Sequence, residues 1–445
     1  MVSLQLRLGV ASNGLTRSAG VTVSANSQVI EYLDIYATGS GIDVAGYDNV
    51  TIRYCRIWYN INAGASAVYG IVADGADNLT IQNCEVINAG APQRGPLSST
   101  SQSCIRVNAG GGLTVSNVTV RSGSTGLLMI GVNGTSISNF ESHDMRGPYP
   151  RGMAMQYASC TGTHTATDLS DESIPGTSKN EDSFSVFNTP NVTMSRVKVP
   201  IGTDATSGRG VVFEQAGTQN CSLNDAEFIW MYNGAAAYGL GCDTVSFTNI
   251  KTKGWNRFSV YGWAGSSGKT PTGYPPLTFS ADVVTSGTFN ASWYDRGYTA
   301  TDNWNLSTFG VGVSSSLTLT NWTPTLSVVR NAFPWRPTYF VPQMLLPLRI
   351  GSYWQPNPNT GATGLEGNTA TAGTAVLCVL PGKYQYDPTG LAWQWYRDGA
   401  PISGETGINY VTVAGDAGKT ITVQEVPSNS AGSGATQTAV GVLCA

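Results

Sequence analysis

The sequence predicts an all-β protein, and three observations carry this prediction. Charged residues make up 12% of the 445 residues, about half the usual share, which excludes coiled coils and long surface helices because these need charged faces. The chain also holds 11 Trp, 20 Tyr and 12 Phe, enough aromatic side chains to build a large core, which argues against disorder. Finally, short segments that alternate apolar and polar residues recur along most of the chain, as expected of strands with one buried face.

One pattern recurs at intervals of 22 to 57 residues: apolar, usually Ser or Thr, apolar, two variable residues, apolar, variable, usually apolar. It starts at Val50, Leu79, Leu113, Thr135, Val192, Cys221 and Val245, with a weaker match at Thr161. A second strand precedes each pattern, with apolar residues eight and six positions upstream, from Ile42 and Val44 to Ala237 and Gly239. Because such strands cannot bury their apolar faces alone, we expect coils that stack through parallel pairing of equivalent strands.

These coils resemble the right-handed parallel β-helix of pectate-lyase-like proteins. The resemblance covers residues 29–328, is clearest over 42–252 and weaker to 325, and leaves residues 1–28 as an N-terminal cap or attachment segment. The fifth position of the pattern is often Asn, which suits a tight corner because it tolerates a left-handed φ, at Asn83, Asn117, Asn139 and Asn249. We therefore expect a structural ladder of Asn side chains. The Asn-x-Ser/Thr tripeptides at Asn49, Asn78, Asn117, Asn191 and Asn321 are explained by the same repeat.

The eight cysteines show no metal-binding spacing, and most occupy apolar positions of the repeat, so buried thiols are favoured over disulfides.

The C-terminal part has a different organisation. Residues 329–364 are rich in proline, which predicts a linker. Residues 365–445 resemble the Ig-like modules of bacteriophage structural proteins and bacterial surface proteins, since Cys378 and Trp395 match the first Cys and the core Trp of an Ig sandwich. Val423 stands where the second Cys would fall, so the disulfide state of Cys378 and Cys444 stays open. The predicted fold class is thus all-β, with a right-handed parallel β-helix followed by a small Ig-like β-sandwich.

No catalytic site can be assigned from the coil pattern. Paired carboxyl groups of glycosidases lie roughly 5 to 9.5 Å apart, whereas Asp43 and Glu214, both outward on the first strand of their coils, are six coils or roughly 29 Å apart. The remaining candidates are Asp43, Asp74 and Arg106, which could form one polar patch, and Asp182; a solvated face is the alternative. Both histidines fall in residues 141–182, where a functional excursion or a plain connecting loop is expected.

Aromatic residues that directly follow the second strand are candidate glycan-binding side chains, because flat rings stack on sugar faces. They could equally seal the core or form a subunit interface. The six are Trp58, Tyr59, Trp230, Tyr232, Trp255 and Trp263.

Composition also limits the partners. The net charge is −4 and basic residues are scattered, which argues against nucleic acid, and no apolar run reaches the roughly 18 residues of a membrane span. The N-terminus lacks the pattern of a signal peptide, so either the chain is not exported by that route or the sequence is that of a mature form. With the first alternative we expect synthesis in a host cytoplasm. We expect no cofactor and no metal.

The favoured function is a structural or adhesion protein of a virion surface, such as a bacteriophage tailspike, fibre or decoration component. The resemblance implies a homotrimer that contacts other virion proteins and binds host cell-surface polysaccharide. The alternative is a polysaccharide lyase or glycoside hydrolase acting on that polysaccharide.

Overall fold

The computed structural model describes residues 15–61, 67–91, 96–148, 150–173, 178, 181–201, 209–229, 237–240, 245–253, 262–264, 326, 328, 331, 333, 349–352, 369–370, 372–373, 376–380, 390–407, 409–429, 432–439 and 441–445. These residues fall into two compact units, the first holding the described residues up to 333 and the second those from 349 onward. Each unit is described by itself.

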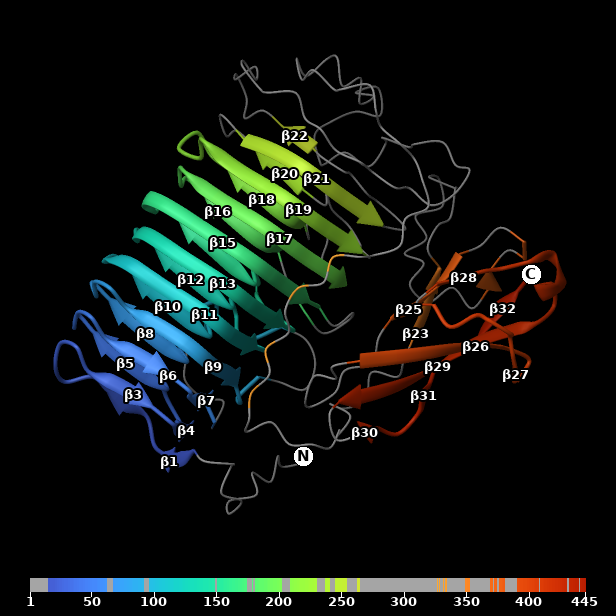
Figure 1. Cartoon of the computed structure of the whole chain (residues 1–445), viewed down its shortest axis with the longest axis horizontal. Coiled ribbons are helices and arrows are strands. Elements are labelled where there is room, and N and C mark those ends of the chain that lie inside the picture. Colours follow the sequence, from blue (N-terminus) through green and yellow to red (C-terminus); the bar gives the residue numbers. More distant parts are fainter. Residues whose placement is uncertain are drawn as a thin grey trace. The chain divides into compact units, whose positions relative to one another are not determined.

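The first unit is a stack of coils whose strands form two parallel sheets (Figure 1). In the described part, the twelve-stranded sheet follows the order β1 (Thr16–Ser18), β4 (Leu33–Tyr36), β7 (Arg56–Tyr59), β9 (Thr80–Asn88), β11 (Gly111–Arg121), β13 (Asn133–His143), β15 (Thr161–Glu172), β17 (Val192–Ile201), β19 (Cys221–Ile229) and β21 (Val245–Lys253), with β3 (Val29–Glu31) and β6 (Thr51–Arg53) beside this path.

The ten-stranded sheet takes one further strand from each coil. Its order in the described part is β2 (Val21–Thr22), β5 (Ile42–Ala45), β8 (Ile71–Asp74), β10 (Ile105–Asn108), β12 (Leu127–Ile130), β14 (Met155–Ala158), β16 (Asp182–Phe187), β18 (Arg209–Glu214), β20 (Ala237–Leu240) and β22 (Gly262–Ala264). The predicted stack of parallel coils is therefore confirmed. Because β1 and β2 already pair with β4 and β5, the stack includes part of the segment expected as a cap.

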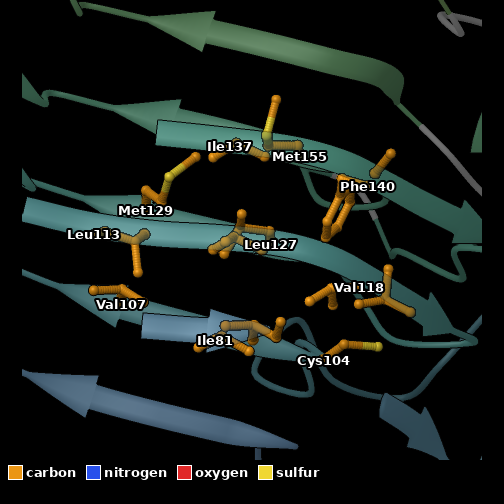
Figure 2. Packing of buried hydrophobic residues seen from close by; sticks show 14 of the residues in the cluster. Ile81, Cys104, Val107, Leu113, Val118, Leu127, Met129, Ile137, Phe140 and Met155 are labelled. Carbon is orange, nitrogen blue, oxygen red and sulfur yellow. The ribbon is translucent and has the colours of Figure 1, made fainter. Parts of the chain in front are cut away.

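The core of the stack consists of apolar rows that run from coil to coil (Figure 2). Ile105, Leu127 and Met155 are partners in successive strands of one sheet, and all three are fully buried. Equivalent rows come from the other sheet, where Val118 pairs with Phe140. Burial of each large apolar side chain contributes about 1.5 to 3 kcal/mol, so the stack gains most of its stability from these rows.

The corner predicted at the fifth position of the pattern is present as a ladder of amide side chains. Asn83, Asn117 and Asn139 have φ values of 53°, 54° and 52°. Asn117 Nδ2 donates to Asn83 Oδ1, and Asn139 Nδ2 donates to Asn117 Oδ1 at 3.1 Å. A second ladder joins Asn78 to Asn49, with the donated hydrogen bond at 3.0 Å. Asn is favoured here because it adopts the left-handed region more easily than other residues with a side chain.

Two coils differ from the predicted register. His164, and not Thr161, is the partner of Thr135 and Val192; a bulge in this pair of strands lies between Asn133 and Thr135. The turn between the two strands is longer here than in the preceding coils, so Gln156 takes the outward position expected for Ala154.

The same happens in the coil that contains β18. Val211 and Phe213 are the buried pair, so Val212 occupies the outward position that the sequence predicted for Glu214. Residues 141–182 contain β14 and β15 and are therefore not a single excursion from the stack.

The described cysteine side chains are buried free thiols, which confirms the prediction for six of the eight: Cys55, Cys84, Cys104, Cys160, Cys221 and Cys444. Burial is the main reason that the pKa of Cys104 is raised to about 12. Cys444 is free, Cys378 lies in β25, and Cys242 lies outside the described residues.

The second unit contains two small sheets. One has the order β23 (Arg349–Ser352), β25 (Val376–Leu380), β28 (Asn409–Val411), and its described pairs are antiparallel. The other has the order β24 (Thr369–Ala370), β32 (Val442–Cys444), β29 (Thr420–Asn429), β26 (Gly390–Arg397), β27 (Ala400–Pro401), with β30 (Gly432–Ser433) and β31 (Gln437–Thr438) also on β29.

Trp395 is fully buried in the core of this unit, and Val423 is its cross-strand partner. The linker was predicted over residues 329–364, and most of these lie outside the described residues. Of the described ones, β23 belongs to the second unit, and Asn331 and Phe333 belong to the first.

Candidate functional site

A guanidinium, a carboxylate and an aromatic ring meet on the outer face of the ten-stranded sheet. Arg106 Nη1 donates to Asp74 Oδ1 at 2.9 Å, and its guanidinium carbon lies 5.4 Å from the centroid of the Tyr69 ring. The side chains of Arg106 and Asp74 are 22% and 53% exposed. Since a guanidinium has five N–H donors, Arg106 can donate hydrogen bonds to Asp74 and to a ligand at the same time.

Strand pairing positions these groups. Ile105 and Val107 point into the core, which directs Arg106 outward between them. Arg106 is the register partner of Val72, and Asn108 is that of Asp74, so the ion pair runs diagonally across the two strands. The candidates Asp74 and Arg106 therefore lie together on a rigid surface.

Further polar contacts follow along the same sheet, where Gln156 and Ser185 are buried. Arg151 Nη1 donates to Gln156 Oε1 at 2.8 Å, and Gln156 Nε2 donates to Ser185 Oγ at 3.4 Å. Burial lowers the pKa of Arg151, while Glu181 and Tyr69 act in the opposite direction. Tyr69 thus lies within electrostatic range of Arg151 and against the guanidinium of Arg106.

Asp43 lies on β5, next to the strand that carries Asp74. Its carboxylate accepts a hydrogen bond from the Ala45 amide at 2.9 Å. Because Asp43 is the register partner of Val72, its Cα lies two residues and one strand from Asp74, a separation of roughly 8 Å at ordinary strand spacings. Asp43 and Asp74 are therefore much closer to one another than Asp43 and Glu214, the pair considered in the sequence analysis. Glu214, by contrast, is in the row of Asp74 but five strands away, roughly 24 Å.

Asp182 is not part of this surface. It begins β16, is 1% exposed, and its register partner is Arg209.

The six aromatic candidates differ in where the structure places them. Tyr59 is fully buried, and its hydroxyl donates to the Gln102 carbonyl at 2.8 Å, so this ring seals the core, which is the alternative given for these candidates. Strand β7 extends to Tyr59, and because side chains alternate along a strand, Tyr59 lies on the buried face with Ile57.

Trp58 stands on the other face, stacked on Tyr36 with 6.0 Å between ring centroids, and Arg56 lies 4.6 Å from its ring. Trp263 lies in β22, and Trp230, Tyr232 and Trp255 lie outside the described residues.

The sequence analysis missed a row of polar and charged residues on the outer face of the twelve-stranded sheet. The seventh position of the pattern supplies it, and strand pairing places its members in register. We call it the charged row: Asp34, Arg56, Glu85, Thr119, Glu141, Ser170, Lys198 and Glu227. The signal was present in the sequence, because this position lies between apolar positions yet carries ionisable residues in most coils.

A later part of the chain covers the charged row. Leu326 donates its amide to Glu227 Oε1 at 2.9 Å and accepts from Lys198 Nζ at 2.7 Å. The Asn331 amide donates to Glu141 Oε1 at 2.8 Å. We call Leu326, Val328, Asn331 and Phe333 the return segment, since it runs from the later coils toward the earlier ones.

His143 lies beside the charged row, between two carboxylates. Its Nε2 is 3.6 Å from Glu141 Oε2 and its Nδ1 is 3.3 Å from Glu172 Oε2. His143 and Glu141 are almost fully buried. Because Glu141 also accepts from the return segment, this cluster is part of an internal contact and not of an open surface.

Comparisons with known proteins add no family. No protein-family model matches the sequence, and no curated protein matches it. Among the residues that the structure describes, no group of three or more His, Cys, Asp or Glu side chains could hold a metal ion, and no helix is long and apolar enough to cross a membrane.

Proposed function

We propose that this protein is a spike, fibre or decoration component of a bacteriophage surface that binds host cell-surface glycan. The observation that carries the glycan proposal is the contact of the partly exposed Arg106 and Asp74 with one another and of Arg106 with Tyr69, on the outer face of the ten-stranded sheet. Sugars are bound by such combinations, because a ring face accepts the apolar side of a pyranose while charged groups exchange hydrogen bonds with hydroxyls.

The stacked coils support the proposed role as a shaft. Each coil adds roughly 4.8 Å of length, so the stack displays a surface at a distance from its attachment point. By resemblance to pectate-lyase-like spikes we propose a right-handed helix and a homotrimer. Light scattering at micromolar concentration tests the trimer: a mass near three times 46.8 kDa is expected, and a monomer mass would overturn it.

We also propose that the second unit is an Ig-like module. The buried Trp395 opposite Val423 supports this, as does the enclosed Asp416, which accepts from Tyr410 Oη and Arg397 Nε.

Glycan binding is tested with polysaccharides extracted from host surfaces. Arg106→Gln and Asp74→Ala are expected to weaken binding by the full chain about tenfold each, which corresponds to about 1.4 kcal/mol. Arg196→Gln is the matched control, because Arg196 also forms an ion pair at the surface of the stack, with Asp168 at 2.7 Å. Equal binding by all four proteins would overturn this assignment of the site.

The pair Asp43 and Asp74 supports a second candidate, a polysaccharide lyase or glycoside hydrolase. The two Asp residues stand on the outer side of adjacent strands, with Cα positions roughly 8 Å apart. Inverting glycosidases use two carboxyl groups that face one another across about 6.5 to 9.5 Å, and neighbouring outward Asp residues are a pair in this sheet that meets the requirement of proximity. A depolymerisation assay on the same polysaccharides separates the candidates. Cleavage that Asp74→Ala and Asp43→Ala abolish would replace the binding proposal with the enzymatic one.

A further inference from the structure

We propose that Tyr32 and Tyr54 form a second glycan site, separate from Arg106, and that this site takes neutral hexopyranose units. The inference rests on the proposed glycan-binding function but on different residues. Tyr32 follows β3 and Tyr54 follows β6, two paired strands near the N-terminal end of the stack.

The two rings are stacked on one another, with centroids 5.0 Å apart and planes that differ by 5°; we call this stacked pair the platform. Tyr32 is the exposed ring of the pair, at 48%, and Tyr54 supports it from the next coil. An exposed aromatic ring matches the C–H face of a pyranose ring, which is apolar on one side.

The platform occupies a position where Tyr is costly. Tyr32 and Tyr54 have φ values of 56° and 54°, the left-handed region that a bulky residue rarely adopts. The equivalent corners of the later coils have the same conformation and carry Asn83, Asn117, Asn139, Asp168, Arg196 and Asp225. None of these is aromatic, so the choice of two bulky rings at the first two corners is not required by the coil and points to a role in binding.

An ion pair beside the platform supplies the polar contacts. Arg53 Nε donates to Glu31 Oε2 at 2.7 Å, with the two side chains 39% and 35% exposed. Hydroxyl groups both donate and accept, so one sugar can bond to the carboxylate and the guanidinium together. The pair has no net charge, because Glu31 already neutralises Arg53, so it offers an anionic ligand no unpaired cation. These charges favour a neutral sugar over an anionic one.

The test uses an array of neutral gluco-, galacto- and manno-oligosaccharides and the full chain. Tyr32→Asn and Tyr54→Asn remove a ring and install a residue that other corners carry, so both variants are expected to fold. Each should weaken binding of the neutral oligosaccharides about tenfold, while Tyr32→Phe, which keeps the ring, should bind as the wild type does. Thermal unfolding of each variant confirms the fold.

The possible results separate the two proposals. Wild-type binding that both Asn variants retain, or that only Arg106→Gln reduces, would overturn the platform and leave the proposed function in place. A change of oligomeric mass in Tyr32→Asn would also overturn it, because the rings would then belong to a subunit interface. Absence of any glycan binding by the wild type, on the array and with host polysaccharides, would overturn both.

Discussion

The backbone amide of Asn331 donates to the carboxylate of Glu141 at 2.8 Å across 190 positions of sequence. Both residues are almost fully buried, and Asn331 Nδ2 also donates to Thr119 Oγ1 at 3.0 Å. The return segment is thus held by side chains of the charged row on at least two strands, β11 and β13.

Glu141→Ala is expected to destabilise the first unit by about 2 to 3 kcal/mol, because a buried hydrogen bond to a charged group is lost and the Asn331 amide is left without its acceptor. Urea denaturation measures the change. Ser136→Ala, an exposed change on the same strand, is the control and should shift stability by less than about 0.5 kcal/mol. Equal stability of the two variants would show that the contact contributes nothing.

Asn117→Ala is expected to cost about 2 kcal/mol, since it removes two ladder hydrogen bonds and leaves in the left-handed region a residue that lacks the polar side chain by which Asn tolerates this conformation. Asn117→Gly should cost less, because glycine adopts this conformation freely but lacks the side-chain bonds. Chemical denaturation of both variants gives the order. If Gly were the worse substitution, the left-handed φ would not be the reason for Asn at this corner.

Folding stability should decrease as the pH falls from about 6.5 to 4, because of His164. Burial lowers the pKa of His164 to about 4, whereas an unfolded His has a pKa near 6.5. The unfolded chain therefore takes up a proton in this window and the folded chain does not, which lowers stability by about 3 kcal/mol in total. His164→Val, which installs the residue found at Val192 in the next coil, should flatten the profile. An unchanged slope in that variant would assign the effect to other groups.

Asp416→Asn is expected to loosen the second unit. Burial by itself raises the pKa of Asp416, but hydrogen bonds from the Val413 amide, Tyr410 and Arg397 outweigh it and lower the pKa. Asp416 is buried, whereas the Arg397 side chain is 35% exposed, so the loss of the Asp416 charge should cost about 2 kcal/mol. This loss speeds hydrogen exchange of the β26 and β29 amides about 30-fold. Asp398→Asn, at an exposed pair with Lys419, is the control. The folding stability that the charged Asp416 contributes should also be lost as the pH falls below about 4, because the carboxylate then becomes protonated.

The six described thiols should resist alkylation in the native protein and react after unfolding. All six are buried, which keeps the reagent away. Burial also raises the pKa of Cys104 to about 12 and that of Cys221 to about 11, so little reactive thiolate forms at these two; at Cys55 a hydrogen bond with Cys84 lowers the pKa, and its protection comes from burial alone. Peptide mapping after iodoacetamide treatment identifies the labelled cysteines. Rapid native labelling of Cys104 would contradict the enclosed core.

The coil stack was predictable because its stability comes from local alternation. Ile105 and Val107 alternate with polar residues within a four-residue strand, which is enough to identify its buried face. The equivalent strand of most coils has apolar residues at the same two positions. The Asn corners were predictable for a similar reason, since a left-handed φ selects a residue type at a single position.

The candidate site was predictable only in part. Arg106 and Asp74 could be placed together because parallel register relates them directly. Tyr69 could not, since it precedes its strand and no alternation fixes its direction. The contact of Asn331 with Glu141 depends on a path through distant sequence, and the coil pattern carries no information on that path. The two register errors arose from turns, whose length is free to vary while the strands on either side keep their pairing.

The return segment changes how the stack can come apart. In a simple solenoid each coil touches only its neighbours, so the end coils can peel away one after another. Here Leu326 is bonded to Lys198 and Glu227, while Asn331 is bonded to Thr119 and Glu141, in coils several layers earlier. Peeling of the layers around β19 therefore also pulls on the layers around β11. This linkage protects the stack against shear and proteases, because no layer between the two anchor points frays on its own.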